Sequence, residues 1–350
     1  MVVVDDTVWS AQDTSPAEIE AALRRLLYER HSESEAYVPA RVLNLVCIVD
    51  REWRGEIANR LRRVGRYHAS RTIVCAVSKG RTTIDALASV SGETAPTDGE
   101  HVLTHETVIL DLGPGHLERL ETIVDPLVIT DLTTLVWAPH GHWKAVEALR
   151  ELSQSVLLDS AEDPDVAGAL RRAQRLLADR YVVDLAWLRS TPWRERIATL
   201  FDPPAQRARL REITALRIRN APESGAAALL LCGWLRSRLG WAQGTLERDG
   251  LGSSIGTMGD VEVRLKSVRL DVPGLEGVTL GFRDGAELSL DRGAGGLRAT
   301  SRDHAGTERT WTLLGASRGE GGILGEGLRQ SLLRDPSYGA ALASAEAMLT

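Results

Sequence analysis

Apolar positions in the first half of the chain follow two alternating patterns. Near-continuous apolar runs occur at 41–50 (RVLNLVCIVD), 71–78 (RTIVCAVS), 104–112 (THETVILDL), 133–139 (TTLVWAP) and 155–158 (SVLL). Such runs are typical of strands that are buried on both faces of a parallel sheet. Stretches with helical spacing separate them, so the pattern predicts an open α/β sheet covered by helices.

A further helix is expected before the first of these strands. Ser15 and Glu18 are spaced as a capping box, Pro16 suits the first turn, and an apolar stripe follows from Ile19. The stretch 88–100 (ASVSGETAPTDGE) has the small and polar residues of a loop.

The second half of the chain changes character. Asp163 is expected to cap a helix, 213–221 reads as a strand and 226–241 as a strongly apolar helix. From residue 260 onward, apolar and polar residues alternate with period two between turn-type residues, which predicts antiparallel hairpins. Two helices, at about 321–334 and 337–349, are expected near the end.

These patterns together predict an α/β protein in three parts. Residues 1–35 are expected to form an N-terminal helical extension, and residues 36–165 an α/β domain with an open, mostly parallel sheet covered by helices. Residues 166–350 are expected to form an α+β C-terminal domain with antiparallel hairpins and terminal helices.

Composition narrows the class of protein. The chain has 350 residues, 43% of them hydrophobic, and a net charge of −6, which argues against a partner as anionic as nucleic acid. The sequence predicts neither a signal peptide nor a membrane span, so a cytoplasmic protein is expected. Cys47, Cys75 and Cys232 lie in apolar runs without a CxxC motif, so they predict buried, inert thiols and neither zinc nor a disulfide.

Several loops carry residues that could bind an anion. Gly113 and Gly115 join a strand to a helix, with His116 beside them, and His140 and His142 follow another apolar strand. Ligands bind at such strand ends in open α/β sheets, but the glycine spacing of a dinucleotide fingerprint is missing. We therefore expect no metal and no cofactor, and we find no complete catalytic constellation. The acidic residues after the strand at 155–158 are expected to cap a helix or lie in solvent, with a magnesium or sugar-phosphate role as the alternative.

The segment 184–202 (DLAWLRSTPWRERIATLFD) is unusually dense in tryptophan and arginine. Pro192 is expected to separate a short turn or helix at 184–190 from a second helix, in which Trp193 begins an apolar stripe. Trp187, Arg189 and Arg194 are candidates for a partner-binding face, because tryptophan and arginine anchor many protein interfaces. Alternatively, both tryptophans belong to the core and the arginines pair with nearby acids such as Asp184.

The same segment carries a resemblance to a known family. Its D-L-A-W-x-R-x-T-x-W-R run resembles the centre of the OpcA family, the glucose-6-phosphate dehydrogenase assembly proteins. Further agreement comes from the first-strand run at 40–45 (ARVLNL), from His68-Ala69-Ser70-Arg71, from LLDSAEDP at 157–164 and from the G-W-L-x-S-R-L run at 233–239. The resemblance covers roughly residues 40–350.

The resemblance implies a protein without catalytic activity that binds glucose-6-phosphate dehydrogenase and promotes its active oligomer in the oxidative pentose phosphate pathway. The alternative from the residues themselves is an enzyme or sensor that binds a sugar phosphate or nucleotide in the strand-end loops of the N-terminal domain. No nucleic-acid or membrane partner is expected, and the oligomeric state of the chain itself is left open.

Overall fold

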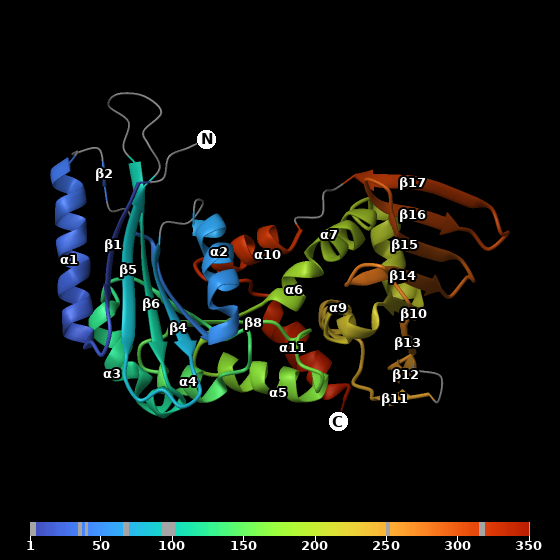
Figure 1. The fold of residues 1–350 in the computed structure, drawn as a ribbon. Helices are drawn as coiled ribbons and strands as arrows, with labels where there is room; N and C mark the ends of the chain where they lie inside the picture. The colour runs from blue at the N-terminus through green and yellow to red at the C-terminus, as the bar shows by residue number, and fades with distance from the viewer. Residues whose placement is uncertain are drawn as a thin grey trace. The chain divides into compact units, whose positions relative to one another are not determined.

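The computed structural model describes residues 5–33, 37–38, 41–65, 70–92, 102–249, 253–314 and 319–349. The chain divides into two compact units that interleave along the sequence (Figure 1). The first unit comprises Met1–Leu158, Arg180–Val183 and Leu324–Leu333; the second comprises Asp159–Asp179, Asp184–Ile323 and Arg334–Thr350. The predicted division after residue 165 stays a prediction about independently folding domains, and the predicted boundary after residue 35 lies outside the described residues.

The first unit is built on a nine-stranded sheet. Its strand order is β1-β5-β6-β4-β3-β7-β8-β9, and β2 pairs with β6. The pairings of β3 with β4 and β7, of β4 with β6, and of β7 with β8 are parallel, whereas β1 and β5 add an antiparallel edge. The strands are β1 (Asp5–Ala11), β2 (Tyr37–Val38), β3 (Leu43–Asp50), β4 (Ser70–Val77), β5 (Asp85–Gly92), β6 (Val102–Leu112), β7 (Thr134–Trp137), β8 (Ser155–Leu158) and β9 (Tyr181–Asp184).

Helices lie against this sheet as the apolar pattern predicts. α1 (Pro16–Glu33) packs beside β5 and β1, and α2 (Arg54–Gly65) connects β3 to β4 (Figure 1). α4 (Trp143–Ala148) connects β7 to β8. Every residue of β4 is buried, as are the first seven of β3, which confirms the mostly parallel, covered sheet.

Three local predictions are wrong. The N-cap of α5 (Val166–Leu177) is Asp165, whose side chain accepts a bond from the Gly168 nitrogen at 3.0 Å, and not Asp163. Residues 88–92 belong to β5 and not to a loop, because Ala86, Ala88 and Val90 alternate with more exposed residues and small side chains suffice to bury that face. The stretch 115–124, whose helical spacing between two apolar runs predicts a single helix, is a 3₁₀ helix, Pro114–Arg119, followed by the short α3 (Leu120–Val124).

A buried ion network holds the centre of the first sheet. Glu106 on β6 is 1% exposed and accepts bonds from Nε of Arg71 at 2.6 Å and from Nε of Arg41. Nη1 of Arg71 also donates to the Leu127 carbonyl at 2.9 Å. The arginines of two family-like runs therefore meet one carboxylate; His68 and Ala69 of the second run lie outside the described residues.

The second unit is built on an eight-stranded sheet in the order β11-β12-β13-β10-β14-β15-β16-β17. Only the β10–β13 pairing is parallel among these. The hairpins predicted after residue 260 are confirmed. The strands are β10 (Ile213–Asn220), β11 (Leu246–Arg248), β12 (Ser253–Met258), β13 (Val261–Ser267), β14 (Leu275–Phe282), β15 (Glu287–Gly293), β16 (Gly296–Arg302) and β17 (Glu308–Leu314).

A pair of closely packed helices forms the core beside this sheet. α9 (Gly225–Leu239) lies against β10 and also packs on α11 (Tyr338–Ala347). Gly233 permits the second contact, because a Cβ there would meet the Ala341 carbonyl and the Ala345 nitrogen. Gly240 ends α9 with φ of 68°, as glycine does at a helix C-terminus. The remaining helices are α5 (Val166–Leu177), α6 (Leu185–Arg189), α7 (Thr191–Leu200), α8 (Pro204–Arg209) and α10 (Gly319–Gln330).

None of the described helices combines the length and the apolar character that a membrane crossing requires.

Candidate partner-binding site

The tryptophan- and arginine-rich segment folds as two short helices, α6 and α7. Asp184 caps α6, accepting a bond from the Ala186 nitrogen at 2.9 Å, and Pro192 occupies the first turn of α7. The division at the proline is confirmed. Four consecutive residues of α6, Leu185 to Leu188, are buried, so this helix has no wide solvent face.

Trp187 and Arg194 form one buried cluster. Trp187 is 2% exposed; its Nε1 donates to Oδ2 of Asp335 at 2.8 Å, and its ring lies 5.6 Å from that of Tyr338 between centroids. The Arg194 guanidinium carbon lies 3.4 Å from the centroid of the Trp187 ring, and burial lowers the pKa of Arg194 to about 10. A role for these two residues in partner binding stays a prediction, since neither offers much surface in this structure.

Arg189 and Asp184 make separate contacts. Nη1 of Arg189 pairs with Oδ2 of Asp159 at 2.7 Å, and the Arg189 side chain keeps 21% of its surface exposed. Asp184 accepts bonds from Ser160 Oγ at 2.6 Å and from Tyr338 Oη at 3.2 Å. Burial, and then the nearby Asp159 carboxylate, raises the pKa of Asp184 to about 6. The arginines of this segment thus pair with acids other than Asp184: Arg189 with Asp159, Arg194 with Asp335 at 3.6 Å, and Arg196 with Glu195.

Asp159, Asp184 and Asp335 lie at or next to the first residues of the three segments that make up the second unit. Asp159 and Asp184 are the first residues of two of its segments, and Asp335 is the second residue of its last segment. α6 contacts Asp159 through Arg189 and Asp335 through Trp187, and it is capped by Asp184, while α7 reaches Asp335 through Arg194. All of these residues belong to the second unit. The segment therefore fixes the ends of three chain segments that are distant in sequence.

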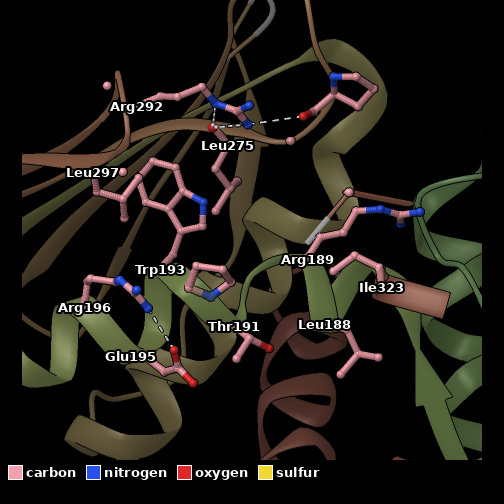
Figure 2. Close-up of a pocket in the computed structure, with 16 residues that line it drawn as sticks. Leu188, Arg189, Thr191, Trp193, Glu195, Arg196, Leu275, Arg292, Leu297 and Ile323 are labelled. Atoms are coloured by element: carbon pink, nitrogen blue, oxygen red, sulfur yellow. Dashed lines mark hydrogen bonds and ion pairs between the residues drawn. The ribbon is translucent and has the colours of Figure 1, made fainter. Parts of the chain in front are cut away.

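The same helices also line a cavity of about 440 Å³ in the second unit (Figure 2). Trp193 on α7 is 5% exposed and borders the cavity together with Leu275, Leu297 and Ile323. The described lining residues also include Arg189, Arg196 and Arg292 and one acid, Glu195. It is the feature of this segment best suited to receive a ligand or a partner side chain.

The loop at Gly113 satisfies its own polar groups. The Gly113 nitrogen donates to Nδ1 of His116 at 3.1 Å, and a Cβ at Gly113 would collide with the Arg81 carbonyl. A Cβ at Gly115 would meet open space. The backbone donor nearest the predicted anion site is thus already used within the loop, and the anion-binding role of Gly113, Gly115 and His116 stays a prediction.

His140 and His142 lie where the strand order reverses. Chain order runs outward from β3 through β4 and β6 on one side and from β7 through β8 on the other, so the reversal falls between β3 and β7. The His140 ring lies 5.4 Å from the Trp53 ring, and Nε2 of His142 lies 3.2 Å from Oδ1 of Asp50. Burial lowers the pKa of His140. Among the described residues, no group of three or more histidine, cysteine or acidic side chains is arranged to hold a metal.

Sequence reasoning missed Asp335, Tyr338 and Arg292, which complete the cluster and the cavity. They lie far along the chain from α6 and α7, and no local motif marks them.

Comparison with known proteins decides the family. Residues 62–175 match the model of the OpcA N-terminal domain and residues 180–342 that of its C-terminal domain, each described as a domain of a glucose-6-phosphate dehydrogenase subunit. The chain belongs to the OpcA family.

Curated OpcA proteins are similar over part of their length. They are provisionally named OxPP cycle proteins. The Synechococcus elongatus protein is 29% identical over 172 residues, which is 48% of this chain and 39% of that protein. The Nostoc punctiforme protein is 32% identical over 145 residues, 39% of this chain and 30% of that protein. The matched region thus spans well under half the length of these relatives.

Solved structures align with this chain only at low similarity. The super-repressor mutant of Gal80p from Saccharomyces cerevisiae aligns with a TM-score of 0.46 and 8% identity, covering 85% of this chain and 87% of that chain. Apo scyllo-inositol dehydrogenase from Lactobacillus casei aligns with a TM-score of 0.45 and 10% identity, covering 89% and 94%. Likeness at this level carries no inference about function.

Proposed function

We propose that this OpcA-family chain binds glucose-6-phosphate dehydrogenase and promotes its active oligomer without performing catalysis itself. The observation that carries the proposal is the match of both parts of the chain to domains described as belonging to a glucose-6-phosphate dehydrogenase subunit. The names of the curated relatives, which refer to the OxPP cycle, support the same pathway.

Such an activator works by unequal affinity. A protein that bound the active and inactive assemblies of the dehydrogenase equally well would shift neither population. The chain must therefore contact a surface that exists, or is correctly arranged, only in the active assembly. Its effect is then a rise in the fraction of active dehydrogenase, seen as a higher kcat, a lower apparent KM or a larger mass.

The reversal point of the first sheet supports this role over a nucleotide-binding one. Folds that bind dinucleotides there have a glycine-rich turn after the first parallel strand, which lets the pyrophosphate approach the backbone. In this chain β3 ends at Asp50 and continues into Arg51–Trp53, and the Trp53 ring lies near that of His140. Nε2 of His142 also lies 3.2 Å from Asp50 Oδ1 at the same place. The position suited to a phosphate therefore holds bulky and acidic side chains of the protein itself.

The test is a steady-state assay of the dehydrogenase from the same organism, with and without the full chain, across glucose 6-phosphate concentrations. The mass of the mixture is measured in parallel by analytical ultracentrifugation. An unrelated protein of similar net charge at the same concentration serves as the control for nonspecific stabilisation. We expect a change in kcat or KM together with a complex of larger mass.

Two results would reject the proposal. If the rates of the dehydrogenase and the mass of the mixture are unchanged at concentrations of the chain far above micromolar, the dehydrogenase is not its partner. Reduction of a nicotinamide cofactor by the chain and glucose 6-phosphate without the dehydrogenase would assign the catalysis to the chain itself. Binding of glucose 6-phosphate to the chain alone would favour the sensor alternative.

A further inference from the structure

The cavity of the second unit combines an apolar interior with an excess of positive charge. Trp193, Leu275, Leu297 and Ile323 are each at most 8% exposed and border it. Among the residues that the structure describes, three arginines, Arg189, Arg196 and Arg292, and one acid, Glu195, line it. A volume of about 440 Å³ lies within the range of sites that take a small ligand or a few side chains.

The three arginines differ in how their charge is balanced. Arg189 pairs with Asp159 at 2.7 Å, and Nη1 of Arg196 donates to Glu195 at 2.9 Å. Arg292 donates only to neutral carbonyl oxygens, those of Leu275 and Pro273, at 3.0 and 3.2 Å. No carboxylate in the described part of the chain lies within ion-pair distance of Arg292.

The backbone is shaped to hold Arg292 in place. Gly274 has φ of 117°, which other residues rarely adopt, and a Cβ there would lie 2.8 Å from Nη2 of Arg292. The Pro273-Gly274 turn thus leaves room for the guanidinium and supplies a carbonyl that orients it. Figure 2 shows Arg292 bonded to two backbone oxygens, and Arg196 bonded to Glu195 beside Trp193. A fixed guanidinium loses little freedom on binding and suits a planar carboxylate.

From these features we infer that the cavity receives an acidic and apolar peptide segment of the partner protein. An aliphatic or aromatic side chain would pack against Trp193 and Leu297, and a neighbouring carboxylate would pair with Arg292. Arginine clusters are a recurrent means of binding acidic motifs, and buried tryptophan and arginine commonly dominate interface energies. A free sugar phosphate fits less well, because its hydroxyl groups would face leucine, isoleucine and indole surfaces. This inference rests on the proposed function for the identity of the partner.

The test compares two single-charge variants of the full chain. Both arginines are exposed on neighbouring strands, but Arg292→Gln removes a guanidinium that lines the cavity, whereas Arg298→Gln removes one on β16 that does not. Isothermal titration calorimetry measures the binding of each to the dehydrogenase from the same organism at low and physiological salt. Arg292→Lys keeps the charge but loses the planar fork.

We expect Arg292→Gln to raise Kd at least about tenfold and Arg298→Gln to leave it within about twofold. Arg292→Lys should give an intermediate Kd. Circular dichroism and the urea midpoint of each variant show whether the fold is kept, and Arg292→Lys provides the decisive comparison if Arg292→Gln is unstable.

Each failure has a distinct meaning. Normal dehydrogenase binding by folded Arg292→Gln or Arg292→Lys would overturn the cavity inference and leave the proposed function intact. Absence of binding by the wild-type chain would overturn both. Glucose 6-phosphate and inorganic phosphate are also titrated into the wild-type chain and into Arg292→Gln. If the wild-type chain binds either anion and Arg292→Gln does not, the ligand of the cavity is a small anion and the peptide inference is overturned.

Discussion

Replacing Trp187 tests whether the tryptophan of α6 supports the fold or contacts the partner. Trp187→Phe removes the Nε1–H donated to Asp335 at 2.8 Å, while Asp335 keeps its bonds from the Ser337 nitrogen and hydroxyl. The lost hydrogen bond should therefore cost the lower part of the range for an ionised acceptor, about 1.5 kcal/mol. Trp187→Ala also empties a core position that is 2% exposed, for a cost of about 3–5 kcal/mol.

The assay is urea unfolding followed by far-UV circular dichroism. If the free energy of unfolding falls by about 2–3 kcal/mol per molar urea, a loss of about 4 kcal/mol lowers the midpoint by about 1.3–2 M. Trp53→Phe serves as the control, because Trp53 is 42% exposed and surface changes usually stay within about 0.5 kcal/mol. Dehydrogenase binding is measured in parallel, and folded Trp187→Phe should bind normally. If Trp187→Ala leaves the urea midpoint unchanged and weakens dehydrogenase binding, the structural role is refuted and Trp187 contacts the partner instead.

Three further changes probe other parts of the fold. Glu106→Gln leaves the buried Arg71 without its carboxylate and should lower the free energy of unfolding by about 3–5 kcal/mol in urea titrations; a loss below about 1 kcal/mol would mean that the ion network contributes little. Gly233→Val should cost at least about 1–3 kcal/mol in the same titrations by forcing α9 and α11 apart, whereas Gly55→Ala, in open space on α2, should be neutral or slightly stabilising; equal effects would contradict the close helix contact. Asp184 has a pKa of about 6 in the fold and about 3.9 when unfolded, so its folded form binds more protons between about pH 4 and pH 6 and its contribution to stability should rise as pH falls through that window. The urea midpoint of Asp184→Asn should lack this contribution, and identical pH profiles for it and the wild type would count against the burial of the carboxyl.

The strands of the parallel sheet could be predicted because continuous apolar runs have few other structural meanings. β5 could not, since its buried face consists largely of alanine and its sequence resembles that of a loop. The 3₁₀ helix at Pro114 was missed for a related reason, because apolar spacing over ten residues does not distinguish one helix from two short ones.

Only the part of the candidate site on α6 and α7 could be predicted from the sequence. The density of tryptophan and arginine marked α6 and α7, and Pro192 gave their division. Whether Trp187 faces water or core depends on Asp335 and Tyr338, which lie far along the chain. Arg292 carries no sequence signal either, because what distinguishes it is that its described hydrogen bonds go to backbone carbonyls and not to a carboxylate, which depends on the fold.

The interleaving of the two units sets the order in which the protein can be completed during synthesis. The first unit includes Leu324–Leu333, so it is not complete when the ribosome has passed Leu158, nor when β9 has emerged. Until Leu324–Leu333 has been made, the first unit is incomplete, and most of the second unit is synthesised before the first unit can be completed. An N-terminal fragment that ends at any point between residues 159 and 323 lacks Leu324–Leu333 and therefore part of the first unit. Expression of either unit should therefore use the whole chain.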